Sequence, residues 1–426
     1  MPGYSIHLTL LFMFLTRIKT TLLGLAGAAA LFTACQKETV APPPTGNVPN
    51  LRPLTAAERQ TVGSANDFAY RAFGALRQGA PAANLFISPL SISAALTMAY
   101  NGADGSTKTA MKSTLGFTPL TDLEINQAYQ GLFGLLGGLD NRVRFTVANS
   151  IWHGEQYQLA APFVQKNQTY FNASVRGVNF ASPTTANTIN SWVSASTQGK
   201  IPTILDGTSA DDVMYLINAL YFKGDWTYRF DPQLTRREPF QLEGGGSTLV
   251  DMMMMTRGKY LKYQDGQQQV IDLPYGNKQF SMTLIVPQGT ATLADVAGRL
   301  SAGQLATWLA RADSTTWHLH LPKFRLAYEQ ELNQTLTQLG MGVAFGGQAN
   351  FSQMLANGAT NLAISSVKHK AVLEVNEEGS EAAAVTSVGV GTTSLPPAVY
   401  INRPFLFLIR EKASNAVLFM GQLTNP

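Results

Sequence analysis

The sequence predicts a mixed α+β protein whose helices and strands build one large domain or two smaller ones. Its 426 residues are 45% hydrophobic and 14% charged, which is ordinary for a globular protein and sufficient for a large core. After Thr55, apolar residues such as Phe68 and Ala72 recur at helical spacing. Residues 143–153 alternate like a half-buried strand, and residues 213–223 are rich in the β-branched and aromatic side chains that favour strands.

The N-terminal segment has the features of a secretory signal over residues 1–34. Arg17 and Lys19 precede an apolar run at residues 21–33, which is too short to span a bilayer comfortably. A charged start, a short apolar core and small residues at its end are typical of signal peptides that are removed after export. Translation could begin at Met13 instead of the first methionine, because the preceding residues add an apolar patch without a clear role.

The single cysteine of the chain, Cys35, follows this signal directly, so no intramolecular disulfide can form. Thr33 and Ala34 before it resemble a bacterial lipobox, which implies that the cysteine is acylated and anchors an exported protein to a membrane. A plain signal peptide or an N-terminal membrane anchor is the alternative. Residues 35–54 are polar and Pro-rich, as expected of a tether. The folded domain is therefore predicted at residues 55–426, in the periplasm, at the cell surface or in the extracellular space.

Charge and composition exclude several classes of partner. The formal net charge of +4 is spread along the chain, and no basic patch is interleaved with aromatic residues, so we expect no nucleic-acid binding. Beyond the signal, no segment approaches the roughly 18 uninterrupted apolar residues of a membrane-spanning helix.

The folded domain is predicted to begin with a helix, a short strand and a second helix. Residues 84–92 indicate the strand and the start of the second helix, because Ser88-Pro89 is a typical helix start and Asn101-Gly102 a typical break. The other elements that we expect are helices at 163–171 and around 189–193, and strands at 250–255, 260–263, 271–275, 280–287, 318–324, 405–410 and 417–422.

The motifs of common enzyme classes are absent from the sequence. There is no Gly-x-Ser-x-Gly elbow, no His-Glu-x-x-His, no phosphate-binding glycine loop and no pair of cysteines. His318 and His320 share one face of a predicted strand, but no third ligand lies near them in the sequence. We therefore expect a protein that is not an enzyme and that holds neither a metal nor a cofactor.

Residues 377–397 have the composition of a strand rather than that of a surface loop. The segment starts with two acids and a glycine, and it has no charge or proline between Ala382 and Ser394. One face would carry small and then β-branched side chains, at Ser380, Ala382, Ala384, Thr386, Val388 and Val390. The other face, which could stay near solvent, would carry Glu381, Ala383, Val385, Ser387, Gly389 and Gly391. Composition alone also allows a flexible loop before the last hairpin, or a resident strand.

The flanks of this segment carry a family resemblance. Glu377, Glu378, Gly379, Ser380, Glu381, Ala382, Ala383 and Ala384 together resemble the hinge of the serpins, the serine protease inhibitor family. Pro396-Pro397 and residues 402–405 resemble the segment just after the reactive-centre loop of that family, and the likeness extends over residues 55–426. The resemblance implies three β-sheets, about eight or nine helices, a monomer, and an exposed reactive loop at about residues 377–397.

Four polar residues far apart in the sequence match the group that holds the central sheet of serpins shut. They are Ser88, Ser91, Asn218 and His369. Asn218 lies within an apolar strand, where an unpaired buried amide would cost about 1–3 kcal/mol, so it must have a hydrogen-bond partner. Without the family, the two serines would be interpreted as helix caps. Trp226 matches the breach, where the loop enters the sheet.

The resemblance also implies the bond that a target protease would attack. In inhibitory serpins this bond lies about fourteen residues past the hinge glycine, which places it between Thr393 and Ser394 here. The small uncharged Thr393 favours elastase-like or subtilisin-like serine proteases, with papain-like cysteine proteases as a lesser alternative. A non-inhibitory serpin, or a surface lipoprotein that only binds a partner, remains the competing interpretation.

Overall fold

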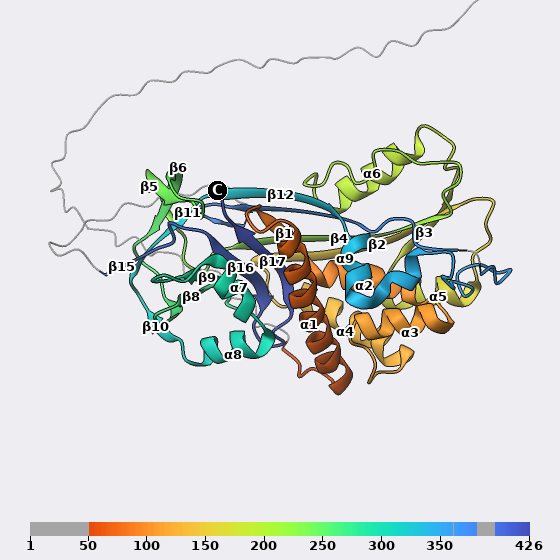
Figure 1. Ribbon diagram of the computed structural model, residues 1–426, viewed down its shortest axis with the longest axis horizontal. Helices are drawn as coiled ribbons and strands as arrows, with labels where there is room; N and C mark the ends of the chain where they lie inside the picture. Colours follow the sequence, from red (N-terminus) through yellow and green to blue (C-terminus); the bar gives the residue numbers. More distant parts are fainter. Residues whose placement is uncertain (1–50, 361, 381–396) are drawn as a thin grey trace, which may run out of the picture. The chain divides into compact units, whose positions relative to one another are not determined.

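The computed structural model describes residues 51–360, 362–380 and 397–426 (Figure 1). These residues form the α+β fold that the sequence predicts. The signal, Cys35, most of the tether, the hinge residues 381–384 and the Thr393–Ser394 bond lie outside the described residues.

Helices flank the sheets, and several begin with clear capping signals. Thr55, Thr121 and Thr292 each cap a helix, and an acid three residues later returns the hydrogen bond in a capping box. The described helices are α1 (Ala56–Gly79), α2 (Pro89–Tyr100), α3 (Gly105–Thr114), α4 (Asp122–Gly138), α5 (Ala161–Phe171), α6 (Thr185–Ser196), α7 (Leu293–Arg299), α8 (Ala302–Ala310) and α9 (Asn333–Leu336). A π-helical turn (Thr337–Met341) and a 3-10 turn (Gly342–Phe345) follow α9. No helix in the described ranges is both long and apolar enough to cross a membrane.

A seven-stranded sheet forms the centre of the core. Its strand order is β1 (Leu85–Ile87), β17 (Val417–Leu423), β16 (Phe405–Glu411), β9 (Phe280–Pro287), β8 (Gln268–Pro274), β7 (Tyr260–Gln264) and β10 (Asp313–Thr315). The predicted C-terminal hairpin is confirmed as the antiparallel pair β16–β17, and every residue of both strands is buried. Apolar runs without alternation are expected of strands that are covered on both faces.

A four-stranded sheet lies at one end of the molecule, on the left in Figure 1. Its strands, in order, are β15 (Ala398–Tyr400), β11 (His318–Pro322), β6 (Ser247–Met255) and β5 (Asp231–Gln241). The prediction of one strand over residues 318–324 was wrong at its end. The ladder stops at Pro322, the Lys323 amide donates to the Asp251 carbonyl at 2.8 Å, and the chain passes into another sheet.

The remaining strands form two groups that flank a gap. One group is β14 (Gly379–Ser380), β4 (Met214–Asp225), β2 (Val143–Gly154) and β3 (Ser174–Val178), and the other is β12 (Phe324–Glu331) with β13 (Lys368–Val375). No described ladder joins β4 to β13. The described strands therefore form four hydrogen-bonded groups instead of three sheets, because no described ladder crosses the gap between β4 and β13.

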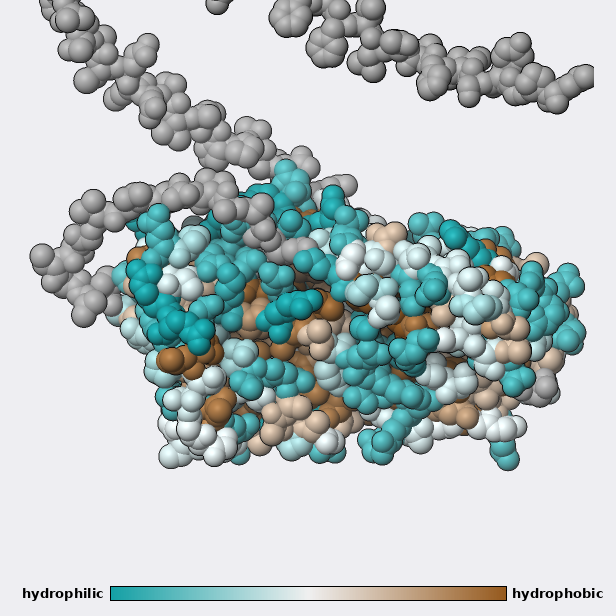
Figure 2. Space-filling view, turned by 90° about the horizontal axis from the view of Figure 1, so that it is seen from above, coloured by the Kyte–Doolittle hydropathy of each residue, from teal (hydrophilic) through white to brown (hydrophobic). Residues whose placement is uncertain are grey.

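Side chains on the two faces of β4 pack into different cores. Leu220 and Phe222 belong to the large central core, whereas Ile217 and Ala219 pack with Trp152 into a smaller core beneath α6. The molecular face that carries β12 and α6 is mainly hydrophilic, with apolar side chains visible between the polar ones (Figure 2).

Candidate functional site

The segment that follows β13 is held against β4 rather than exposed. Glu377 and Glu378 are each only 8% exposed, although the sequence predicted them at the start of an exposed loop. Their carbonyls accept hydrogen bonds from the amides of Phe230 and Trp226, at 2.9 and 2.7 Å. The indole Nε1 of Trp226 donates to the Asn376 carbonyl at 3.0 Å. The tryptophan predicted at the breach thus fastens the start of the loop.

The buried carboxylate of Glu377 is stabilised by distant partners. Burial opposes its ionisation, but hydrogen bonds from its own amide, from Thr235 and from Lys323 outweigh that effect and keep the pKa of Glu377 below its ordinary value. The Thr235 hydroxyl lies 2.8 Å and the Lys323 ammonium 3.1 Å from its carboxylate oxygens. The Glu377 carboxylate can therefore remain ionised although it is buried.

Gly379 allows an approach that no side chain would permit. A Cβ atom there would lie 2.1 Å from the Gly224 carbonyl oxygen and 2.7 Å from the Cα of Asp225. Gly379 and Ser380 form β14, which pairs antiparallel with Asp225 and Gly224 of β4. Ser380 is 2% exposed, and its hydroxyl lies 2.8 Å from that of Tyr275. These two residues already occupy the first positions of a strand beside β4.

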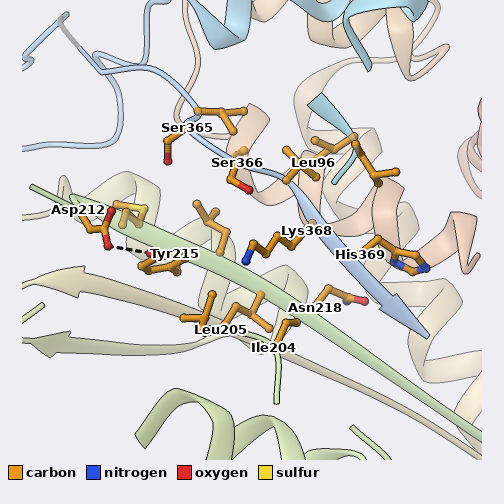
Figure 3. Close-up of a pocket in the computed structure, with 18 of the residues that line it drawn as sticks. Leu96, Ile204, Leu205, Asp212, Tyr215, Asn218, Ser365, Ser366, Lys368 and His369 are labelled. Atoms are coloured by element: carbon orange, nitrogen blue, oxygen red, sulfur yellow. Dashed lines mark hydrogen bonds between the residues drawn. The ribbon is translucent and has the colours of Figure 1, made fainter. Parts of the chain in front are cut away.

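Beyond β14, the edges of β4 and β13 face a cavity of about 610 Å³ (Figure 3). Strand edges without a neighbour present backbone groups that can pair with an added strand. The walls combine apolar side chains from β4, α2 and the segment after α6 with polar groups from the segment that leads into β13. Labelled in Figure 3 are Leu96, Ile204, Leu205, Asp212, Tyr215, Asn218, Ser365, Ser366, Lys368 and His369.

The segment after α6 also contacts β13 across this cavity. Three exposed or half-buried polar contacts join the two: Lys200–Glu374 at 3.7 Å, Lys370–Thr203 at 3.4 Å and Lys368–Asp206 at 3.4 Å. Each contact of this kind contributes little to stability, because water screens it. Together with the apolar side chains of Ile204 and Leu205, they place this segment as one wall of the cavity.

The four predicted polar residues form two hydrogen-bonded pairs, and Ser91, Asn218 and His369 of these line the cavity. The Ser88 amide donates to His369 Nε2 at 3.1 Å, while its hydroxyl donates to the Leu418 carbonyl at 2.8 Å. The Ser91 hydroxyl donates to the side-chain oxygen of Asn218. Ser88 is also the N-cap of α2, so the interpretation as a helix cap is confirmed for this residue as well. The pairs connect α2 to β13 and to β4.

A fifth polar residue, Asn149, was missed from the sequence. The Asn218 amide donates to Asn149 Oδ1 at 2.6 Å, and the Asn149 amide donates to the Phe171 carbonyl at 2.7 Å. These two asparagines face one another in the β2–β4 register. Polar residues at facing positions of two adjacent strands were the signal that could have identified the pair, but the register was unknown.

His369 is held in its neutral form. Burial lowers the pKa of His369 to about 4. Because Nε2 accepts the Ser88 amide, the ring proton must reside on Nδ1. Protonation would remove this acceptor and leave a buried charge.

The described residues contain no group of three or more His, Cys, Asp or Glu side chains placed to hold a metal ion. His320 lies near one carboxylate, with its Nδ1 3.7 Å from Glu238 Oε2, and its ring stacks on Tyr400. His318 and His320 both belong to β11.

Comparisons with known proteins agree with this architecture. A family model described as "Serpin (serine protease inhibitor)" matches residues 63–426. Leukocyte elastase inhibitor of Sus scrofa is 34% identical over 372 residues, which cover 84% of this chain and 97% of the relative. Serpin B9 of Homo sapiens is 33% identical over 371 residues, with 84% and 97% covered. The crystal structure of the thermophilic serpin tengpin in the native state superposes with a TM-score of 0.77 at 28% identity, covering 88% of this chain and 96% of that one.

Proposed function

This chain belongs to the serpin family, and we propose that it inhibits a serine protease by acting as a suicide substrate. The observation that carries the proposal is the pairing of β14 with β4 at the start of a strand edge that no other described strand joins. The loop that follows Ser380 is uncharged from Ala382 to Ser394 and contains no proline over that range. It can therefore continue along β4 into the cavity once it is cut.

The observed register predicts which residues would meet. Continuing the Gly379–Asp225 and Ser380–Gly224 pairs places Glu381 opposite Lys223 and Val390 opposite Met214, the first residue of β4. Insertion over residues 381–390 would thus run along this edge of β4 over its whole length. At about 3.4 Å per residue, this added strand measures roughly 34 Å.

The side chains of the loop suit the two faces of this added strand. Ala382, Ala384 and Thr386 would lie opposite Phe222, Leu220 and Asn218, on the face where Ser380 is already buried. Small side chains fit there without displacing the core. On the other face, Glu381 would meet Lys223, whose direct neighbour on β2 is the exposed Arg144, so opposite charges would pair at the entrance.

The chemistry of trapping requires only the loop and the protease. The protease serine attacks the Thr393 carbonyl, the Thr393–Ser394 bond breaks, and the amine of Ser394 departs with the proton that the protease histidine supplies. An ester then links the protease to Thr393. The protease is attached to Thr393 through this ester, so it is carried along when residues 381–390 insert beside β4. We propose that insertion is complete before water can hydrolyse the ester.

The residues around the bait define the class of target. Val390, Gly391, Thr392 and Thr393 offer no positive charge for a trypsin-like pocket and no large aromatic ring for a chymotrypsin-like one. We therefore propose elastase-like or subtilisin-like serine proteases as targets, and papain-like cysteine proteases as a secondary class. The similarity to a protein named leukocyte elastase inhibitor supports this choice.

The N-terminus adds a proposal about location. The Thr33-Ala34-Cys35 sequence supports export and lipid attachment at Cys35, which would hold the inhibitor on a bacterial membrane by a tether of residues 36–54. Metabolic labelling with a tagged fatty acid tests this directly. Label should appear on the full-length chain and disappear in Cys35→Ser; label that persists in Cys35→Ser would refute lipid attachment at this residue.

The inhibitory function is tested by incubating residues 36–426 with elastases and subtilisin, followed by denaturing gels and intact-mass analysis. We expect a covalent band and a released peptide that starts at Ser394. Cleavage without a complex, accompanied by a large gain in heat stability, would leave insertion intact but contradict trapping of these proteases. Cleavage with neither result would favour a non-inhibitory serpin or a surface lipoprotein that binds a partner.

A further inference from the structure

The exposed side of α4 carries no charge beyond the first turn of the helix. Residues 125–138 contain no Asp, Glu, Lys or Arg. The exposed residues that share one stripe of this helix, three or four positions apart, are Leu123, Gln127, Gln130, Gly134 and Gly138. The solvent-facing stripe of a surface helix normally carries charged side chains. This stripe is therefore unusual for a surface that meets only water.

The charges and glycines of α4 agree with this description. Asp122 lies 2.6 Å from the ammonium group of Lys108, and Glu124 closes the capping box at the start of the helix. Gly134 and Gly138 have open space where a side chain would lie, so packing within the domain does not require glycine at either position. Because glycine weakens a helix interior, these positions keep the surface flat at a cost to α4.

A second helix extends this uncharged surface. The Gln130 side chain of α4 donates to the Thr169 carbonyl of α5 at 2.9 Å, which joins the two helices. Lys166 is the single charged residue of α5. We call the exposed residues within 127–138 of α4 and 161–170 of α5 the neutral face.

The chain enters the fold beside the neutral face. The Arg52 guanidinium donates to Glu58 Oε2 at 2.7 Å and to the Gly131 carbonyl of α4 at 3.1 Å. Glu58 is only 3% exposed, so this pair fixes the first described residues against α1 and α4. Leu51, one residue earlier, is 52% exposed, and Leu123 at the start of α4 is 54% exposed. Two exposed leucines therefore lie on this side of the molecule.

The tether is short enough to keep this side near a membrane. Leu51 is sixteen residues after Cys35. A flexible chain of that length has a root-mean-square span of about 22 Å, and an extended Pro-rich chain reaches about 50 Å. A domain of about 370 residues has a radius of gyration of about 21 Å. A bilayer that holds Cys35 through a lipid therefore meets the surface around Leu51 more often than the far side of the domain.

We propose that the neutral face, with Leu51 and Leu123 at its edge, rests on the lipid surface that holds the tether. This contact rests on the proposed lipid attachment at Cys35 and adds an orientation of the domain to it. Transfer from water towards the acyl chains is costly for charged side chains, and far less so for leucine, glutamine and glycine. The tether makes the contact intramolecular, so a weak contact is sufficient to orient the domain.

This orientation leaves the inhibitory parts of the molecule free. In Figure 1, α4 lies on the side of the molecule opposite to β12 and α6. The segment after α6 forms one wall of the cavity that would receive the loop. A membrane beneath α4 would therefore hold the domain without covering the strand edge along which the loop inserts.

Coupling to vesicles through the single cysteine tests the contact without acylation in a cell. Residues 35–426 are joined through the Cys35 thiol, which adds across the double bond of a maleimide lipid. The vesicles consist of phosphatidylcholine with a minor share of phosphatidylglycerol and of a photoactivatable diazirine phosphatidylcholine. After illumination, mass spectrometry locates the label. We expect peptides of α4 and α5 to carry about tenfold more label than peptides of β12 or of the β5–β6 hairpin.

A variant with added charge provides the second measurement. Gln127→Glu/Gly134→Glu places two carboxylates on the neutral face, and the open space at Gly134 accommodates the new side chain. Glutamate is a better helix former than glycine, so the fold should be retained. The matched control is Ala327→Glu/Gln330→Glu, at two exposed positions of β12. Label on α4 and α5 should fall about fivefold in the first variant and stay at the wild-type level in the control.

Three results would overturn the proposal. The first is label spread evenly over the exposed peptides or concentrated on β12 or the hairpin, and the second is equal labelling of α4 in the wild type and in Gln127→Glu/Gly134→Glu. The third is chain-to-chain products through α4 with little lipid label, which would favour a second copy of this chain as the occupant. None of these measurements depends on acylation in cells or on protease trapping, so failure of this contact is distinguishable from failure of the proposed function.

Discussion

Acidification should weaken the native fold through His369. The pKa of this histidine is lowered by burial to about 4, against about 6.5 in an unfolded chain. Because the folded pKa lies below the unfolded one, the stabilisation is complete above about pH 6.5 and is lost progressively as the pH falls towards 4. Between pH 7.5 and 5, the loss from this single group amounts to about 2 kcal/mol in the free energy of unfolding.

The matched variant is His369→Gln, whose side-chain oxygen can still accept the Ser88 amide but carries no titrating proton. Urea titrations followed by circular dichroism at both pH values give the free energy of unfolding of each protein. The range from pH 7.5 to 5 lies above the titration of Glu377, and the other histidines are common to both proteins. The wild type should lose about 2 kcal/mol more than the variant on acidification. Equal losses would refute the assignment of a neutral, buried His369.

Three substitutions test the insertion path and its polar anchors. Ala384→Arg should turn the inhibitor into a substrate, raising the stoichiometry of inhibition at least tenfold in titrations, because the arginine would be buried opposite Leu220 at a cost of several kcal/mol; an unchanged stoichiometry would contradict the proposed register. Gly379→Ala should displace β14 and lower stability by about 1–3 kcal/mol in urea titrations, whereas Gly346→Ala, with open space around it, should not. Asn218→Ala should lower the same quantity by about 1–3 kcal/mol, since it leaves polar groups of its neighbours unpaired, and an unaltered urea midpoint would argue against this.

Local signals were sufficient for many elements of the fold. The helical spacing of apolar residues after Thr55 and the apolar runs of the C-terminal hairpin depend on residues close together in the sequence, and the structure confirms both. The end of β11 was missed, because it depends on a bond from Lys323 to a strand about 70 residues earlier, a separation that residue spacing does not reveal. Contacts of this kind decide where a strand changes sheet.

The sequence predicted which residues form the candidate site, but it predicted only part of their arrangement in space. The family resemblance brought Ser88 and His369 together, and the structure gives them a direct hydrogen bond. Burial of Glu377 could not be foreseen from the sequence, since two acids followed by a glycine suggest a surface turn. Its charge is accommodated by Thr235 and Lys323, which only the tertiary fold brings near it.

The wall of the cavity formed by Ile204 and Leu205 explains why the loop lacks a hydrophilic side. Continuing the register places Val385 and Ser387 opposite Ala219 and Ile217, which belong to the core beneath α6. After insertion, both faces of the strand would be covered, so the face that the sequence left to solvent would be enclosed as well. Under the same proposal, these residues would face water before cleavage. Under the proposed insertion, residues 382–390 would pass from solvent into a protein interior, so their side chains should be neither charged nor strongly apolar, and small neutral side chains suit both environments.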